Sequence, residues 1–434
     1  MNSVVIGIIG IVILILFFVI RMPVGFAMAF VGFIGAMFLI PPSAALALIS
    51  RDFFQTFSSY GLTVIPLFVF MGAIAFASKI SARLYKAGYI VFGRLPGGLA
   101  MATIAACAGF GAICGSTNAT AAAMGKVSLP EMKRYGYNDA LATGSIAAAG
   151  ALGILIPPST IFVVYGIITE QSIGKLFIAG VFPGILLAAL FCVVVAIWCW
   201  KDPKAAPAGG STTWKEKLDG ITGAIETLVI FFLVILGLFL GWFSPTQAAG
   251  AGCAGTLLVG IVRRQITWPA FWEGVIDSVK ITCMVMVIIA GAIVFGHFMA
   301  VAKIPLILSS WATNLPLPPV AIMGVILIIY LVGGCFMDSL AMITLTVPIF
   351  YPSVLALGFD PIWFGVIIVL VVGMGVITPP VGINVYVING IAEGVPLQTI
   401  FSGIFPFLAA EIICIIIVMF IPAIATFLPS FATY

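Results

Sequence analysis

The chain has 434 residues, of which 63% are hydrophobic and only 7% are charged, and its formal net charge at pH 7 is +4. Because ordinary soluble domains carry about 25% charged residues, this composition excludes a soluble enzyme or binding module. It is typical of an all-α polytopic membrane protein with little chain outside the bilayer. The small net charge gives no indication of nucleic-acid binding.

The first part of the chain predicts membrane helices followed by a basic segment. Apolar runs cover about 4–20, 24–40 and 62–77, whereas residues 44–59 are expected to lie along the membrane interface. The first run has no basic region before it and no cleavage site after it, which favours a retained helix over a signal peptide. Residues 79–94 mix basic and apolar side chains, so we expect an amphipathic surface helix or a solvated basic loop.

Residues 97–132 form two short apolar segments on either side of a Gly-Ser-Thr-Asn turn. As helices, each segment would span about 20–25 Å, less than the membrane core of about 30 Å. The sequence therefore predicts a re-entrant hairpin. The helix expected from Asp139 to Ile168 is interrupted by Pro157-Pro158, and residues 176–200 form an uninterrupted span.

Residues 201–219 are the polar linker between two repeats, 1–200 and 220–434. Their Pro, Gly and Ser content predicts no fixed structure. The second repeat predicts the same succession of elements: helices at about 221–242, 246–262 and 280–300, a hairpin at about 320–352, a broken helix at 362–391 with Pro379-Pro380, and a last span at 400–428.

The two repeats align without gaps at an offset of 222 residues. The matches are Pro96 with Pro318, Pro130 with Pro352, Gly136 with Gly358, Gly153 with Gly375, and Pro157-Pro158 with Pro379-Pro380. This agreement indicates an internal duplication. In lipid every backbone polar group needs a partner, and interrupted helices at matching places in two repeats indicate the ion and substrate site of a secondary transporter. Two ordinary proline-kinked helices are the alternative.

The distribution of basic residues predicts the orientation. With the amino terminus outside the cell, all but three of the 18 Lys and Arg residues fall on or near the cytoplasmic side, the exceptions being Arg51, Lys175 and Lys303. The first hairpin then enters from the cytoplasm. The second repeat begins inside, so its hairpin enters from the opposite face and the repeats are inverted. We expect both termini outside and the linker in the cytoplasm.

The hairpin turns carry the chemistry that a cation and an anion require. Residues 115–120 offer hydroxyl, amide and free carbonyl oxygens, and the break at 153–157 adds carbonyl oxygens for a hard cation such as Na⁺. Helix amino-terminal ends at the same place present N–H groups that suit a carboxylate. In the second repeat the equivalent groups are Met337-Asp338-Ser339 with Gly375, Thr378 and Pro379.

Four acids and one amide stand out within the apolar sequence. Asp338 is the one acid expected deep in the membrane, as an ion ligand, a helix cap or a proton relay. Glu170, Glu393 and Glu411 are expected near helix ends, at the interface or in caps. Asn384 follows the second Pro-Pro break and either reaches the substrate cavity or joins helices.

Cysteine and histidine content gives no sign of catalysis. The eight cysteines lie in apolar runs without a Cys-x-x-Cys pair, which is typical of small buried hydrophobic residues. His297 is the only histidine, and its apolar neighbours indicate a core or interface position. We therefore expect no enzymatic activity, no catalytic residue and no metal other than Na⁺.

Six strings carry a resemblance to a known family. They are G-x-I-x-G-S-T-x-A-T (Gly111–Thr120), G-I-L-I-P-P-S (Gly153–Ser159), F-M-D-S-L-x-M-I (Phe336–Ile343), V-P-I-F-Y-P (Val347–Pro352), L-G-F-D-P-I-W-F-G (Leu357–Gly365) and I-T-P-P-V-G-x-N (Ile377–Asn384). At these residues the chain resembles the large membrane subunit, of DctM/SiaM type, of the tripartite ATP-independent periplasmic (TRAP) transporters. The likeness covers nearly the whole chain.

The resemblance implies a Na⁺-coupled elevator of the wider ion-transporter fold that imports an organic acid. It also implies a small four-helix membrane subunit of DctQ type and a periplasmic substrate-binding protein of DctP type. The chain would then lie in the bacterial inner membrane, with both termini in the periplasm. Two or more Na⁺ ions would be held at Ser116, Asn118, Gly153 and Pro157, and at Asp338, Gly375 and Thr378. Candidate substrate contacts are the nearby side chains of Thr117, Thr120, Ser159, Ser339 and Asn384.

One departure from the family pattern lies before the second Pro-Pro break. Relatives often carry an acidic or amide residue there, where this chain has the apolar residues 371–374. A stand-alone dicarboxylate or citrate symporter of the same fold is the main alternative function. A channel is a weaker one, because two closed polar sites favour alternating access, and an intramembrane hydrolase would need a Ser-His or paired-Asp arrangement that the hairpins do not supply.

Overall fold

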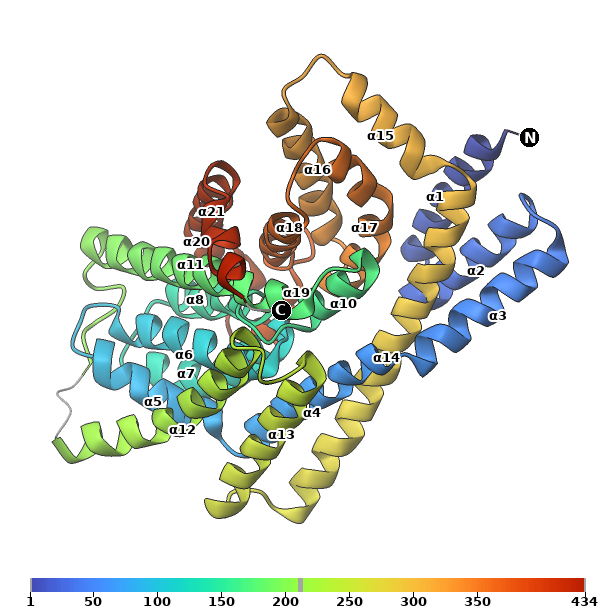
Figure 1. Cartoon of the computed structure of the whole chain (residues 1–434). Helices are drawn as coiled ribbons and strands as arrows, with labels where there is room; N and C mark the ends of the chain where they lie inside the picture. Colours follow the sequence, from blue (N-terminus) through green and yellow to red (C-terminus); the bar gives the residue numbers. More distant parts are fainter. Residues whose placement is uncertain (1, 210–213, 433–434) are drawn as a thin grey trace.

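The computed structural model describes residues 2–209 and 214–432, and within them the chain is helical without a strand (Figure 1). Six of the described helices are long and apolar enough to cross a membrane, or seven if the bent pair around Pro157-Pro158 is one span. The expected all-α polytopic membrane fold is therefore confirmed.

The first half contains eleven α-helices and one 3₁₀ turn among its described residues. They are α1 (Ser3–Val19), α2 (Val24–Met37), α3 (Pro42–Ser58), η1 (Tyr60–Thr63), α4 (Val64–Ala77), α5 (Ile80–Phe92), α6 (Gly98–Cys114), α7 (Thr117–Arg134), α8 (Asp139–Gly150), α9 (Leu152–Leu155), α10 (Thr160–Thr169) and α11 (Ile173–Lys201). The basic segment at 79–94 is thus the helix α5, as one of its two interpretations expected.

The second half follows a similar order. Its described elements are α12 (Trp214–Phe239), α13 (Pro245–Val262), α14 (Trp268–Val301), α15 (Ile304–Asn314), α16 (Pro319–Gly334), α17 (Ser339–Ala356), α18 (Pro361–Gly375), α19 (Ile383–Asn389), α20 (Leu397–Phe420), α21 (Ala423–Thr426) and η2 (Leu428–Phe431). Helices α7 and α17 begin and end 222 residues apart, and so do the first residues of α8 and α18.

Helices that correspond in the two halves begin with the same kind of side-chain cap. Ser116 and Asn138 cap α7 and α8 with their side-chain oxygens, and Asp338 and Asp360 do the same for α17 and α18. Each cap gives a partner to backbone N–H groups that the first turn leaves free and is worth about 1 kcal/mol. The polar residue of each hairpin turn therefore has a structural role whatever ligand it binds.

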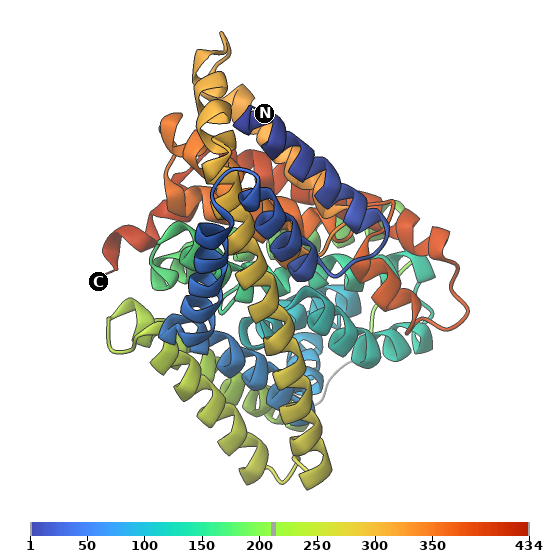
Figure 2. The same cartoon turned by 90° about the vertical axis from the view of Figure 1, so that its right-hand side faces the viewer.

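The halves differ most at α14. This helix runs for 34 residues without interruption, whereas the corresponding part of the first half is divided into α3 and α4 by η1. The expected helix at 280–300 was therefore too short, because no breaker interrupts the sequence after Pro269 at its first turn. Figure 1 shows α14 crossing one side of the molecule beside α2, α3 and α4, and Figure 2 shows it from that side.

Helices of one half pack against helices of the other half in corresponding pairs. Helix α2 packs against α14 and α4 against α13, while α7 packs against α19 and α17 against α10. In the same way α8 packs against α20 and α18 against α11. Each of these contacts between a first-half helix and a second-half helix thus has a counterpart in which the roles of the halves are reversed.

Small residues allow the closest helix contacts. A Cβ added at Gly291 of α14 would lie 2.1 Å from the Gly25 carbonyl oxygen of α2, and one at Gly403 of α20 would lie 1.9 Å from the Ala140 carbonyl oxygen of α8. Close backbone approach of this kind replaces the hydrophobic effect as the source of helix association in a membrane.

The expected linker is partly structured, so the prediction of no fixed structure was wrong for its described residues. Ala205 and Ala206 are buried, and their carbonyl oxygens accept hydrogen bonds from the backbone N–H groups of Asn138 (2.7 Å) and Gly97 (3.0 Å). Helix α12 begins at Trp214, within the range assigned to the linker. Residues 210–213 lie outside the described part.

Candidate ion and substrate site

The first hairpin turn lies against the break of the first broken helix. Helix α6 ends because Gly115 adopts a left-handed conformation, φ +63°, after which the Ser116 hydroxyl accepts the N–H of Ala119 at 3.4 Å and begins α7. The Thr160 hydroxyl, at the start of α10, donates to the Gly115 carbonyl oxygen at 3.1 Å. This hydrogen bond ties the turn to the residues that follow Pro157-Pro158.

Two oxygen atoms of the hairpin converge on Gly153. A Cβ added at Gly153 would lie 2.6 Å from both the Ser116 carbonyl oxygen and the Thr120 hydroxyl, and one at Gly111 would lie 2.8 Å from the Gly153 Cα atom. The Thr120 hydroxyl is buried and has no hydrogen-bond partner among the described residues. Carbonyl and hydroxyl oxygens are the ligands that hard cations prefer, so this cluster fits a small cation.

Three further expected site residues lie in the first turn and the first break: Asn118 and Pro157 for the ion, and Ser159 for the substrate. Pro157 is buried in the break, and its peptide bond to Pro158 is cis, as is that between Pro379 and Pro380. Asn118 is exposed, and its side-chain oxygen accepts the Thr117 hydroxyl at 3.2 Å. Ser159 is fully buried and caps α10, because its hydroxyl accepts the N–H of Phe162 at 3.4 Å.

Asn384 joins the second half to α8, the first part of the first broken helix. Its Nδ2 group donates to the Ala147 carbonyl oxygen at 3.2 Å, and a Cβ added at Gly150 would lie 2.9 Å from that Nδ2 and 3.3 Å from the Thr117 carbonyl oxygen. The Asn384 side-chain oxygen is buried without a hydrogen-bond partner among the described residues. The amide therefore joins helices through its nitrogen and leaves its oxygen free.

The second hairpin turn differs in chemistry from the first. The two carboxylate oxygens of Asp338 accept the N–H groups of Leu340 and Ala341 at 3.3 and 3.4 Å, so the capping role is the one that the structure shows directly. Asp338 is exposed in the isolated chain, whereas the neighbouring Ser339 hydroxyl is buried with no partner among the described residues.

The second break is longer than the first. Helix α18 ends at Gly375, where an added Cβ would lie 2.7 Å from the Cα and carbonyl carbon atoms of Gly334 at the end of α16. The Thr378 hydroxyl donates to the Met374 carbonyl oxygen at 2.7 Å, and α19 resumes after Gly382. Each broken helix thus meets its own hairpin at a pair of glycines.

The expectation that Glu411 lies near a helix end was wrong. It lies well inside α20, is 0% exposed, and has no hydrogen-bond partner for either carboxylate oxygen among the described residues. Asp338 is therefore not the only acid within a segment able to cross the membrane. An acid in the middle of a 24-residue apolar run was the available sequence signal.

Two ion-pair networks were also not predicted. Asp52 is buried and lies 2.7 Å from Nδ1 of His297, which joins α3 to α14. Glu226 of α12 pairs with Arg263 at the end of α13 and with Arg83 of α5. The Glu226 carboxylate raises the pKa of Arg263, whereas burial lowers the pKa of Arg83. Residues this far apart in sequence give no local signal of pairing.

Comparison with solved structures shows a shared fold. The chain superimposes on the YdaH transporter of Alcanivorax borkumensis with a TM-score of 0.62 at 15% identity, over 87% of this chain and 88% of that one. Together with the apolar helices, the paired hairpins and the broken helices, this likeness defines the class as a polytopic helical membrane protein with the fold of that structure.

Sequence comparison shows the family to which the chain belongs. Residues 11–424 match the model of the tripartite ATP-independent periplasmic transporter, DctM component, and the chain belongs to this family. The C4-dicarboxylate TRAP transporter large permease protein DctM of Pseudomonas aeruginosa is 38% identical over 378 residues, 87% of this chain and 88% of the relative. The sialic acid TRAP transporter large permease protein SiaM of Vibrio cholerae is 30% identical, with coverage of 94% and 95%.

Proposed function

We propose that this chain is the Na⁺-coupled large permease subunit of a TRAP system that imports an organic acid across the bacterial inner membrane. The observation that carries the proposal is the meeting of each hairpin with a helix break at a glycine pair, Gly111 with Gly153 and Gly334 with Gly375. Two such places in one chain supply two sites for ions.

The first Na⁺ site is proposed at Ser116, Asn118, Gly153 and Pro157. Its support is the convergence of the Ser116 carbonyl and Thr120 hydroxyl oxygens on Gly153, together with the unpaired state of that hydroxyl. The second site is proposed at Asp338, Gly375 and Thr378, because α16, which ends four residues before Asp338, meets the end of α18 at Gly334 and Gly375. At least two coupling ions follow.

The substrate is proposed to be a carboxylate or a related anion. The amino-terminal ends of α7 and α10 lie together at the first break, joined by the bond from Thr160 to Gly115, and their partial positive charge favours an anion. The proposed contacts are the side chains of Thr117, Thr120, Ser159, Ser339 and Asn384. Relatives named for C4-dicarboxylate and for sialic acid support this class of substrate.

Transport is proposed to occur by an elevator mechanism. The exchanged pairs α7–α19 and α17–α10 join each hairpin to the other half's broken helix, so the four elements form one block. Helices α1–α4 and α12–α15 would be the scaffold. The reversed contacts also support the inverted relation of the repeats 1–200 and 220–434, in which both termini are periplasmic and the 201–219 linker is cytoplasmic.

Two protein partners are proposed: a small four-helix membrane subunit and a periplasmic binding protein that delivers the acid. The tripartite family supports them. The test is Na⁺-driven uptake of radiolabelled C4-dicarboxylate, sialic acid and ectoine into proteoliposomes, with and without the partners encoded beside this chain. Uptake that needs both partners and a Na⁺ gradient supports the proposal. Uptake by the chain alone would support a stand-alone symporter, and uptake indifferent to Na⁺ would refute the coupling.

A further inference from the structure

Glu411 is an enclosed carboxyl group that the proposed Na⁺ and substrate sites do not use. It belongs to α20, one of the helices able to cross the membrane, and is fully buried. Neither of its oxygens has a hydrogen-bond partner among the described residues. An ionised carboxylate in such a place is very unfavourable without a positive partner.

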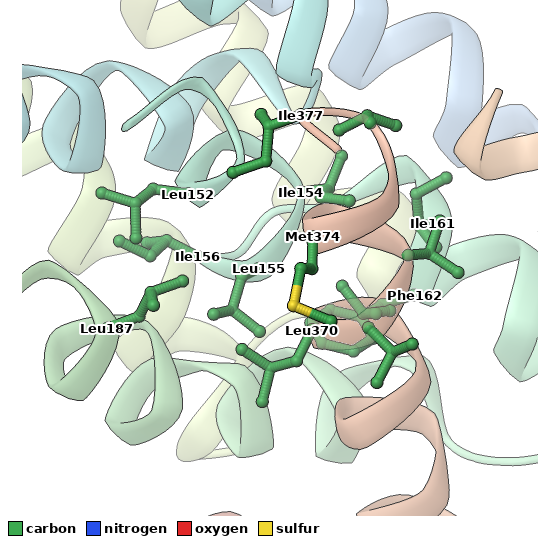
Figure 3. Packing of buried hydrophobic residues seen from close by; sticks show 14 of the residues in the cluster. Leu152, Ile154, Leu155, Ile156, Ile161, Phe162, Leu187, Leu370, Met374 and Ile377 are labelled. Atoms are coloured by element: carbon green, nitrogen blue, oxygen red, sulfur yellow. The ribbon is translucent and has the colours of Figure 1, made fainter. Parts of the chain in front are cut away.

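The carboxyl group lies at the seam between the two broken helices. A Cβ added at Gly373 of α18 would lie 3.4 Å from Glu411 Oε1, 3.7 Å from the Ala151 Cβ and 3.9 Å from the Ile154 side chain. Figure 3 shows apolar side chains from both helices, including Ile154, Leu370 and Met374, filling this seam. These apolar neighbours offer Glu411 no hydrogen-bond donor.

No cation faces Glu411 from the helices packed on α20, which are chiefly α8, α11, α18 and α19. Within these helices and α20 itself, the titratable groups are Asp139, Lys175, Cys192, Cys199, Lys201, Tyr386 and Cys414. Of these, the Cys414 thiol is one helical turn away and has Pro183 of α11 as its neighbour. Lys175 is eight residues before Pro183, about 12 Å along the helix axis.

The site also lacks the oxygen ligands that a metal ion needs. The carbonyl groups on either side of Gly373 are engaged, because those of Val372 and Met374 accept the N–H groups of Val376 and Ile377 at 3.1 and 3.2 Å. A proton needs no further ligand, because it neutralises the carboxylate by forming one O–H bond. Gly373 is two residues before Gly375, so Glu411 stands on the order of 10 Å from the proposed second Na⁺ site.

We propose that Glu411 is a proton-binding site whose proton is released when Na⁺ occupies the second ion site at Gly375 and Thr378. This inference rests on the proposed function. Na⁺ stabilises the ionised carboxylate across the helix, and the proton passes from Glu411 to water on the membrane face to which the block is open. By linkage, Na⁺ should bind more tightly as pH rises, on the order of tenfold between the protonated and ionised forms.

The test uses infrared spectroscopy and proton release on the purified full chain in lipid nanodiscs. The wild type should show a carboxylic acid C=O band that shifts in D₂O and is missing in Glu411→Gln. Glu393→Gln, the same change at an exposed position, should keep the band. Addition of NaCl in weakly buffered solution should release protons from the wild type but not from Glu411→Gln, with KCl as the salt control.

Each outcome tests a separate part of the proposal. Identical carboxyl bands in the wild type and Glu411→Gln would overturn the proton site. Na⁺ binding, measured by calorimetry, without loss of the wild-type band or release of protons would overturn the linkage. Absence of Na⁺ binding to the wild type would refute the second ion site of the proposed function. The carboxyl band would still show whether Glu411 carries a proton. If Glu411→Gln does not fold, the effect of Na⁺ on the wild-type band alone decides the inference.

Discussion

Gly153→Ala should weaken Na⁺ binding at the first site while leaving the fold intact. The added Cβ would lie 2.6 Å from the Ser116 carbonyl oxygen and from the Thr120 hydroxyl, whereas ordinary contact begins at 3.4 Å. The hairpin turn must therefore retreat by about 0.8 Å, more than the roughly 0.5 Å that a functional site tolerates. Overpacking of this kind costs about 1–3 kcal/mol, which corresponds to an increase in the Na⁺ Kd of about 5- to 150-fold.

The assay is calorimetric Na⁺ titration of the purified chain, with thermal unfolding as the measure of folding. Gly250→Ala is the matched control, because Gly250 lies within α13 with open space around its Cβ position. This variant should bind Na⁺ like the wild type. If Gly153→Ala is folded and binds Na⁺ with unchanged affinity and stoichiometry, the hairpin turn does not form the site and the reasoning from its geometry fails.

Three further predictions concern the substrate contacts, the second ion site and the topology. Asn384→Ala should cost about 1–3 kcal/mol of stability because the Ala147 carbonyl oxygen loses its donor. It should also reduce uptake per folded molecule, and unchanged uptake in the folded variant would limit Asn384 to packing. Asp338→Asn should preserve the α17 cap, since Asn caps as well as Asp, but weaken Na⁺ binding by removing the charge; equal Na⁺ affinity in this variant and the wild type would leave Asp338 as a cap alone. Cysteine at the exposed Lys204, in a background without native cysteines, should resist an impermeant thiol reagent from the periplasmic side, and ready labelling there would reverse the proposed orientation.

Local sequence chemistry was sufficient to find both hairpins and both broken helices. The capping residues Ser116 and Asp338 and the Pro-Pro pairs act on their immediate neighbours, so their effects can be read from a short window. No breaker follows Pro269 in the sequence of α14. The duplication nevertheless predicts that this part of the second half divides where η1 separates α3 from α4.

The features that were missed depend on packing between distant segments. The position of Glu411 inside an apolar run was visible in the sequence, but its complete burial was not, because that burial is produced by α8 and α18 packing on α20. The docking of Ala205 and Ala206 likewise depends on backbone partners at Gly97 and Asn138. No side-chain pattern in the linker encodes those hydrogen bonds.

The movement of the hairpins across a static scaffold is tested most directly by a crosslink between Gly72 and Cys114. A Cβ added at Gly72 of α4 would lie 3.4 Å from the Cys114 sulfur and 3.0 Å from the Cys114 Cα atom at the end of α6, so Gly72→Cys can form a disulfide with the native thiol after a small shift of α4 away from α6. We predict that oxidation of this variant, assembled with its two partners in proteoliposomes, abolishes Na⁺-driven uptake and that reduction restores it. Gly72→Ser should be unaffected by oxidation. Full uptake with the crosslink complete would contradict the elevator account, because the first hairpin would then remain fixed to the scaffold throughout transport.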